Sequence, residues 1–437
     1  MDISEDHRGG IAQADDSSTY PGYRVLAFLA FALSLLAFVD GLIPQLQMRL
    51  FAGHILVTNA ILGFVILLAL MLGCFIHPSI EFARLPMFTW LLCIAFLLFH
   101  MPYLILAHDM SLKDVLASYS TYYLLLLSGP AALAFRGAIS ERVIIRCTGI
   151  LLLACAMVGI AQYLTGRPLL YTESVDGKFQ IYSWNFFDDV RAFSLFTSGL
   201  GFGLFCSLCG ALGIALFRKS PIRGASWFVL SALACLSTLT RLCYLVFLCA
   251  SAYALVLVFG KRALRGLWQP ILFFVLAIAT ILSGLRVSVN DAASNLQDSG
   301  SLLMRLDAWS YYLDIFSRSS LIDKLFGGGI ILNKDNVIPI DNVPLALLLH
   351  VGLVGLVLFG VLLTKMWLYL RREALITQQP FIIAAASLWA TLACAGIFNI
   401  VLIQLGGVFA ITIFCKTNRL HDYEPPGVGT SAQVLVP

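Results

Sequence analysis

The feature that most restricts the fold of this chain is a series of about twelve long apolar runs. A helix needs about 20 apolar residues to cross the hydrocarbon layer of a bilayer, and most of these runs have that length. Charged residues make up only 12% of the 437 positions, against about 25% in a soluble domain. We therefore expect an all-α polytopic membrane protein with about twelve transmembrane helices. The runs cover residues 24–44, 54–76, 85–107, 114–135, 143–164, 191–217, 224–239, 242–259, 269–287, 342–368, 380–398 and 400–415.

The two ends of the chain are polar. Residues 1–22 carry Asp, Ser and Gly and do not have the short basic start, apolar stretch and cleavage site of a signal peptide. Residues 422–437 have a similar composition. We expect both ends to be disordered cytoplasmic tails, which leaves residues 23–421 as one transmembrane domain.

The 11 cysteines lie in or beside the apolar runs, so we interpret them as small buried hydrophobes and not as a disulfide framework. Cys206 and Cys209 have the spacing of a metal-binding pair. No second pair and no histidine lies near them in the sequence, and packing between helices is the favoured explanation.

The orientation in the membrane follows from the lysines and arginines of the connections, because cytoplasmic connections are enriched in these residues. From the middle of the chain onward, every second connection is basic. This alternation predicts that both termini are cytoplasmic. The basic connections contain Arg136, Arg142 and Arg146, then Arg218, Lys219 and Arg223, then Lys261, Arg262 and Arg265, then Lys365, Arg371 and Arg372, and finally Lys416 and Arg419.

Two long loops belong to the other, extracytoplasmic side. Loop 165–190 has two basic residues against four acidic ones, and loop 288–341 has four against seven. A loop of some fifty residues is usually functional. The second loop contains an apolar stripe at steps of four and three, which predicts a helix over 302–318 that lies on the membrane surface with this stripe facing down, before a glycine run breaks it. The stripe consists of Leu302, Leu306, Trp309, Leu313 and Phe316.

Several ionisable residues gather at the outer ends of these helices, where charge is costly and tends to be functional. Three arginines and a carboxylate would suit a substrate that has a pyrophosphate group and a hydroxyl to deprotonate. The structural alternative is that the arginines only reach lipid head groups and that Asp341 caps a helix, for which Asp and Asn are well suited. The residues are Arg191, expected to begin the sixth helix just after Asp188 and Asp189, Arg241 at the start of the eighth, Arg305 in the loop helix, and Asp341 and Asn342 at the opening of the tenth.

Over residues 185–415 the sequence resembles the superfamily of O-antigen ligases and Wzy-type polysaccharide polymerases. The ligases carry a His, then Asn, Ser or Gln, nine residues, Gly, two residues and Gly. Here Asp341 and Asn342 are followed at the same spacing by Gly352 and Gly355. Three further stretches are similar in order and placement: Arg191-Ala192-Phe193-Ser194-Leu195-Phe196, Thr238-Leu239-Thr240-Arg241, and Arg305-Leu306-Asp307-Ala308-Trp309 running to Phe326-Gly327-Gly328-Gly329.

The resemblance implies a GT-C-like membrane glycosyltransferase with no metal and no cofactor. Its donor would be an oligosaccharide on undecaprenyl pyrophosphate, attacked by an acceptor hydroxyl at the extracytoplasmic face of a bacterial inner membrane. In this interpretation Asp341, Arg241 and Arg305 are the catalytic residues. The residues that would bind the pyrophosphate or the sugars are Arg191, Asn342, Asp188, Asp189, Arg318 and Trp309.

The departure from the ligase pattern favours a polymerase. The loops 165–190 and 288–341 contain no histidine, and His350 lies nine residues past Asp341, about 13 Å deeper along a helix. We expect His350 to have a packing or polar-contact role. Arg318 and Gly329 also have the Arg-x10-Gly spacing found in some polymerases.

The expected function is therefore the joining of lipid-linked repeat units into O-antigen, capsule or exopolysaccharide. A chain-length regulator and a flippase are possible partners, together with membrane lipid and without nucleic acid. Two alternatives stay open. One is a ligase that transfers finished polymer to a lipid core. The other is a transporter or flippase, although transporters usually place charge deep in their helices and often show repeats that this sequence lacks.

Overall fold

The structure is a computed structural model. It describes residues 21–39, 87–112, 115, 138–166, 185–186, 189–196, 198–260, 297–329, 343–395, 408, 411–412 and 415. The predicted tails and the predicted helices 54–76, 114–135 and 269–287 lie wholly or almost wholly outside these residues, as does most of the last one.

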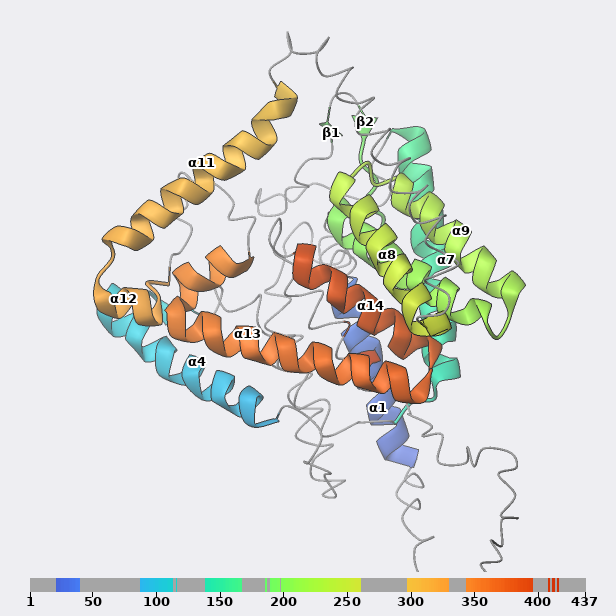
Figure 1. Cartoon of the computed structure of the whole chain (residues 1–437), viewed down its shortest axis with the longest axis horizontal. Coiled ribbons are helices and arrows are strands. Elements are labelled where there is room, and N and C mark those ends of the chain that lie inside the picture. The colour runs from blue at the N-terminus through green and yellow to red at the C-terminus, as the bar shows by residue number, and fades with distance from the viewer. Residues whose placement is uncertain are drawn as a thin grey trace, which may run out of the picture.

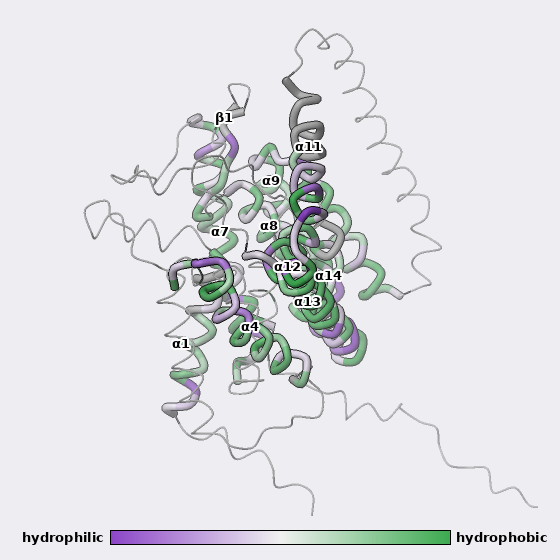
Figure 2. The backbone as a smooth tube through the Cα atoms, turned by 90° about the vertical axis from the view of Figure 1, so that its left-hand side faces the viewer, coloured by the Kyte–Doolittle hydropathy of each residue, from purple (hydrophilic) through white to green (hydrophobic). Residues whose placement is uncertain are grey.

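The described part is mostly helical (Figure 1). Five of its helices are long and apolar enough to cross a membrane, and Figure 2 shows how hydrophobic the helices are along their length. The helices are α1 (Pro21–Phe38), α4 (Met87–His108), α7 (Glu141–Thr165), α8 (Gly199–Phe217), α9 (Pro221–Leu236), an unlabelled helix over Arg241–Gly260, α11 (Gln297–Arg318), α12 (Leu321–Phe326), α13 (Val343–Thr377) and α14 (Pro380–Ala395).

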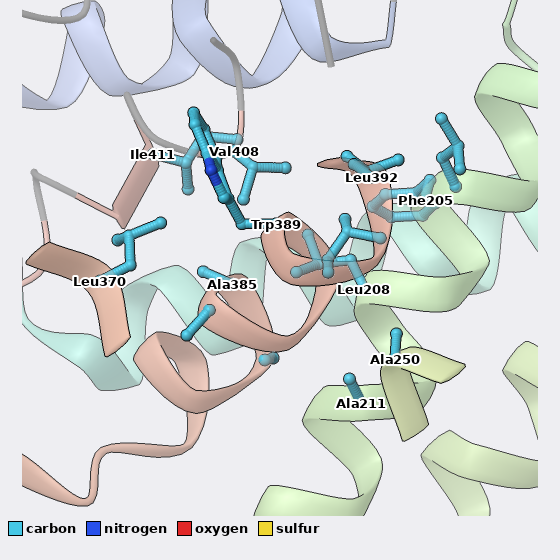
Figure 3. Packing of buried hydrophobic residues seen from close by; sticks show 14 of the residues in the cluster. Phe205, Leu208, Ala211, Ala250, Leu370, Ala385, Trp389, Leu392, Val408 and Ile411 are labelled. Carbon is cyan, nitrogen blue, oxygen red and sulfur yellow. The ribbon is translucent and has the colours of Figure 1, made fainter. Parts of the chain in front are cut away.

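The core of the molecule lies around α8. In the apolar stretch of α8, 89% of the residues are buried. The helices α9 and α14 pack on α8, and α7 and the Arg241–Gly260 helix contact it as well. Figure 3 shows Leu392 of α14 close to Phe205 of α8, while Trp389 reaches toward Val408 and Ile411. A helix that is apolar on every side is stable only when it is surrounded in this way or by lipid.

Hydropathy located the helices well, but three of the predicted details are wrong. The sixth helix begins at Gly199 and not at Arg191. The tenth continues past 368 to Thr377, with a kink at Gly352, so Arg371 and Arg372 lie inside α13. The loop helix ends at Arg318, as predicted, but the glycine run does not end it, because the short helix α12 lies between them.

The loop stripe predicted to lie on the membrane surface can be placed in part. The helix itself is present as α11, which runs from α12 toward the end of the molecule that holds β1 (Asn185–Phe186) and β2 (Asp189–Val190), a short antiparallel pair (Figure 1). Part of its apolar face, however, packs on protein. Trp309 and Phe316 join a small cluster with Leu345 and Leu349 at the start of α13.

Candidate functional site

The residues before α8 form a non-helical segment that enters the helix bundle. Ala192 N donates to Ser237 O at 3.1 Å, which joins the segment to the end of α9. The buried side chain of Gln162 on α7 holds the next turn: its Oε1 accepts from Ser194 N at 2.7 Å and from Phe193 N at 3.2 Å, and its Nε2 donates to Ser194 O at 3.3 Å. A single amide side chain thus satisfies the backbone of this segment.

The segment contacts α7 well before the C-terminal end of this helix. Ser194 Oγ donates to Cys155 O at 2.6 Å, and Cys155 lies ten residues before the last residue of α7, Thr165. At a rise of about 1.5 Å per residue this is about 15 Å along the helix. Ser194 has a φ of 55°, in the left-handed region that non-glycine residues rarely adopt. Such backbone is tolerated at membrane depth only where protein or a polar cavity surrounds it.

A second break lies beside the first, in the turn between α9 and the Arg241–Gly260 helix. Thr238 is fully buried, and its Oγ1 donates to Cys235 O at 2.8 Å. Thr240 N in turn donates to Thr238 Oγ1 at 3.3 Å, and Leu239 has a φ of 49°. The motif Thr238-Leu239-Thr240-Arg241 is therefore a tight turn whose hydroxyls bond to its own backbone and which places Arg241 at the first helical position.

The two breaks bring Arg191 and Arg241 near one another; these two residues are the arginine pair. Arg241 is exposed and Arg191 half-buried. The two guanidinium groups are close enough to interact electrostatically. The start of α8 meets the same turn, since a Cβ built on Gly199 would lie 3.4 Å from Thr240 Oγ1.

Two helix N-termini and two guanidinium groups therefore share one region. A helix N-terminus carries a partial positive charge and unsatisfied N–H groups, which makes it favourable for anions. Guanidinium groups bind phosphate oxygens through two parallel hydrogen bonds and keep their charge when partly buried. The chemistry of this region fits a phosphate or pyrophosphate group.

The other sequence-based candidates are placed as follows. Asp341, Asn342 and Asp188 lie outside the described residues. Asp189 belongs to β2 and Arg305 to α11, but the described part does not include their side chains.

Arg318 and Trp309 can be placed in full. Arg318 ends α11 with its side chain 79% exposed, and its guanidinium pairs with Asp314 one turn earlier, at 2.8 Å between Nη2 and Oδ2. Trp309 packs against α13, and its buried indole N–H has no acceptor among the described residues. In Figure 1, α12, which follows the end of α11 at Arg318, lies at the left edge and α8 at the right, so Arg318 lies far from the arginine pair.

His350 has the packing role expected for it. It is 9% exposed, and its ring meets that of His100 on α4 edge to face, with the centroids 6.4 Å apart.

One polar group was not predicted at all, and we call it the His108 cluster (Tyr103, His108, Ser320, Asp323). Tyr103 Oη donates to Asp323 Oδ1 at 2.6 Å, His108 Nε2 lies 3.0 Å from the same oxygen, and Ser320 Oγ donates to Oδ2 at 2.8 Å. Sequence reasoning missed it because His108 ends an apolar helix more than 200 positions from Asp323 in the loop. The one available signal was that His108 and Asp323, both titratable, lie in connections expected on the outer side of the membrane.

Comparisons with known proteins add no relative: no family model matches the chain, and no curated protein matches it. The placement of charge and of non-helical backbone is therefore the basis for any functional assignment.

Proposed function

We propose that this protein is a polysaccharide polymerase that acts on oligosaccharide repeat units linked to undecaprenyl pyrophosphate, at the outer face of a bacterial inner membrane. The observation that carries the proposal is the arginine pair, supported on two non-helical segments at the starts of two helices. The same two stretches resemble the polymerase and ligase superfamily, which is what points to a lipid-linked saccharide as the substrate.

In the proposed reaction the donor pyrophosphate lies against Arg191 and Arg241. An acceptor sugar hydroxyl attacks the anomeric carbon, a C–O bond forms there, and the bond from that carbon to the pyrophosphate oxygen breaks. The negative charge that develops on the leaving pyrophosphate is stabilised by the two guanidinium groups and by the helix N-termini, which need no reorganisation during the reaction. Asp341 is the proposed acceptor of the hydroxyl proton, and Arg305 a third contact to the pyrophosphate.

A second candidate function is transport of a lipid-linked saccharide. Non-helical backbone near the middle of the membrane is typical of transporters, and residues 191–196 and the turn 237–240 are non-helical and packed inside the bundle. A transporter would move the lipid-linked saccharide without joining two of them.

The test uses the full-length protein in lipid nanodiscs with the lipid-linked repeat unit as substrate. We expect a ladder of longer saccharides together with free undecaprenyl pyrophosphate. Arg191→Lys and Arg241→Lys keep the charge but lose the planar fork, and each should lower the rate at least about tenfold. Arg223→Lys, at the opposite end of α9, is the matched control and should keep the wild-type rate.

Two results would overturn the proposal. One is full polymer output from both arginine variants at normal protein level. The other is a pair of results: the protein in nanodiscs does not extend the repeat unit, and the same protein in sealed vesicles moves the lipid-linked saccharide across the bilayer. Together these results would establish the transporter.

A further inference from the structure

The His108 cluster joins the outer end of α4 to the short helix α12 of the long loop. Its central carboxylate belongs to Asp323, which accepts hydrogen bonds from both elements. The side chains of His108 and Asp323 nevertheless stay 27% and 23% exposed. Solvent can therefore reach the polar atoms of this contact.

The two ring nitrogens of His108 differ in their hydrogen bonding. Nε2 faces Asp323, and among the described residues no group bonds to Nδ1. When Nε2–H donates to the carboxylate, Nδ1 presents a lone pair that can accept a hydrogen bond from a ligand. The carboxylate fixes the ring orientation in the way that carboxylates orient functional histidines.

Among the described residues, the glycine run beside this ring does not cover it. A Cβ built on Gly328 would meet just one described atom within 4 Å, His108 Cε1 at 3.8 Å, and this carbon lies between the two ring nitrogens. Gly328 does not have a positive φ, so its backbone conformation does not require glycine. Any longer side chain at this position would lie against His108.

The turn around Gly328 is itself well fixed. Gly328 N donates to Leu349 O at 3.2 Å, on the first part of α13. Gly327 has a φ of 83° and Gly352 one of 69°, and a Cβ on either would clash with the backbone of the other segment. The position of Gly328 beside His108 is therefore set by a defined backbone arrangement.

Aromatic rings border the same cluster. The Tyr103 ring lies edge-on to His108 with centroids 5.5 Å apart, and Phe326 lies 6.2 Å from Tyr103. Apolar ring faces together with a few well-placed polar groups are the usual lining of a small-ligand site. The carboxylate of Asp323 would repel a phosphate, so the fitting ligand is neutral and rich in hydroxyl groups, which both donate and accept hydrogen bonds.

We propose that His108, Asp323 and Tyr103 form a saccharide subsite, which binds hydroxyl groups of a sugar in the repeat unit at a distance from its pyrophosphate. The inference rests on the proposed function, which supplies an oligosaccharide as substrate. In Figure 1 the cluster, at α12 and the end of α4, lies on the opposite side of the view from α8 and α9.

The test measures how tightly the full-length protein in nanodiscs binds an oligosaccharide that carries neither lipid nor phosphate. This probe is the repeat unit released from the host's own surface polysaccharide. We expect Gly328→Leu and His108→Gln each to weaken binding about tenfold, because each removes or covers a hydrogen bond to the saccharide. Gly360→Leu, on α13 where a Cβ would meet nothing within 4 Å, is the matched control and should bind as the wild type does.

Two further measurements separate this subsite from a structural role and from the proposed function. Hydrogen exchange of α12 should be the same in Gly328→Leu as in the wild type. Arg191→Lys should bind the phosphate-free oligosaccharide normally although it makes little polymer. Unchanged affinity in Gly328→Leu, or no binding by the wild type, would overturn the subsite. A third outcome separates the two proposals. If the wild type binds the oligosaccharide, Gly328→Leu does not, and the wild type makes no polymer, the subsite is supported and the polymerase is overturned.

Discussion

At the scale of single residues, Gln162 is the side chain on which the geometry of the arginine pair depends most directly. Its amide bonds to the backbone of Phe193 and Ser194, two and three positions after Arg191. Nothing in the sequence marks this residue, because a glutamine in an apolar helix is equally compatible with a contact between helices. Arg191 and Arg241, in contrast, could be selected from the sequence, since charge at an expected helix end is rare and costly.

We predict that Gln162→Met displaces the segment that carries Arg191. The substitution leaves two buried N–H groups without their acceptor, and each such group costs about 1–3 kcal/mol. The melting temperature in detergent should fall and polymer output should drop with it. Gln378→Met is the matched control, because the amide of Gln378 donates only weakly, at 3.3 and 3.4 Å, to carbonyls of its own helix. Equal stability of the two variants would contradict the role given to Gln162.

Asp341 provides the second prediction at this scale. Asn caps a helix about as well as Asp does, so a capping role predicts nearly normal polymer in Asp341→Asn and some loss of stability in Asp341→Ala. A proton-accepting role predicts that both variants lose polymer and accumulate single lipid-linked repeat units at normal protein level. We expect the second outcome, measured as the chain-length distribution on gels. A normal distribution in Asp341→Asn would remove this residue from the reaction.

At the scale of elements, hydropathy predicted where helices lie but not where the backbone stops being helical. The apolar run 191–217 includes Phe193 and Phe196, which are both buried, although the helix starts only at Gly199. Hydropathy reports burial, and a buried non-helical segment therefore looks like a helix. The opposite error occurred in α13, whose polar last turns continue the helix to Thr377, directly before a Gln378 with a φ of 52°.

The short helix α12 offers a prediction about pH. Burial raises the pKa of Asp323, but the hydrogen bonds from Tyr103 and Ser320 and the interaction with His108 lower it more, so the pKa lies below the ordinary value of 3.8. A lowered pKa means that the carboxylate stabilises the docked helix above pH 3.8, and that this contribution is lost as the pH falls through the folded-state pKa.

Hydrogen exchange of α12 measures this contribution. After correction for the intrinsic exchange rate, we expect protection at neutral pH that decreases below about pH 3.8 in the wild type. Asp323→Asn should show weaker protection at neutral pH and no such decrease. Asp314→Asn, in the neighbouring exposed pair on α11, should behave as the wild type does. The same acid-induced decrease in Asp323→Asn would assign the effect to another group.

At the scale of the whole molecule, one end holds the arginine pair and the opposite end holds a separate polar contact. Glu141 at the start of α7 accepts from Phe381 N at 3.1 Å, and Lys219 Nζ lies 4.0 Å from the same carboxylate. The start of α7, the end of α8 and the start of α14 therefore meet, as alternating membrane crossings require. The positive-inside rule predicts this end to be cytoplasmic, because Lys219 belongs to a basic connection.

Reporter fusions test this orientation over the whole chain. We expect fusions at Lys219 and Arg371 to report the cytoplasm and fusions at Gly177 and Gly300 to report the outside, with both termini inside and twelve crossings in between. The described helices support the relative arrangement, since α7, α8 and α14 share one end and the arginine pair lies at the other. The absolute direction depends on the basic connections, and a cytoplasmic signal at Gly300 would reverse it. It would also place the arginine pair and the His108 cluster in the cytoplasm, where the mechanism would need a donor on the inner leaflet, so this one measurement tests the topology and the proposed chemistry together.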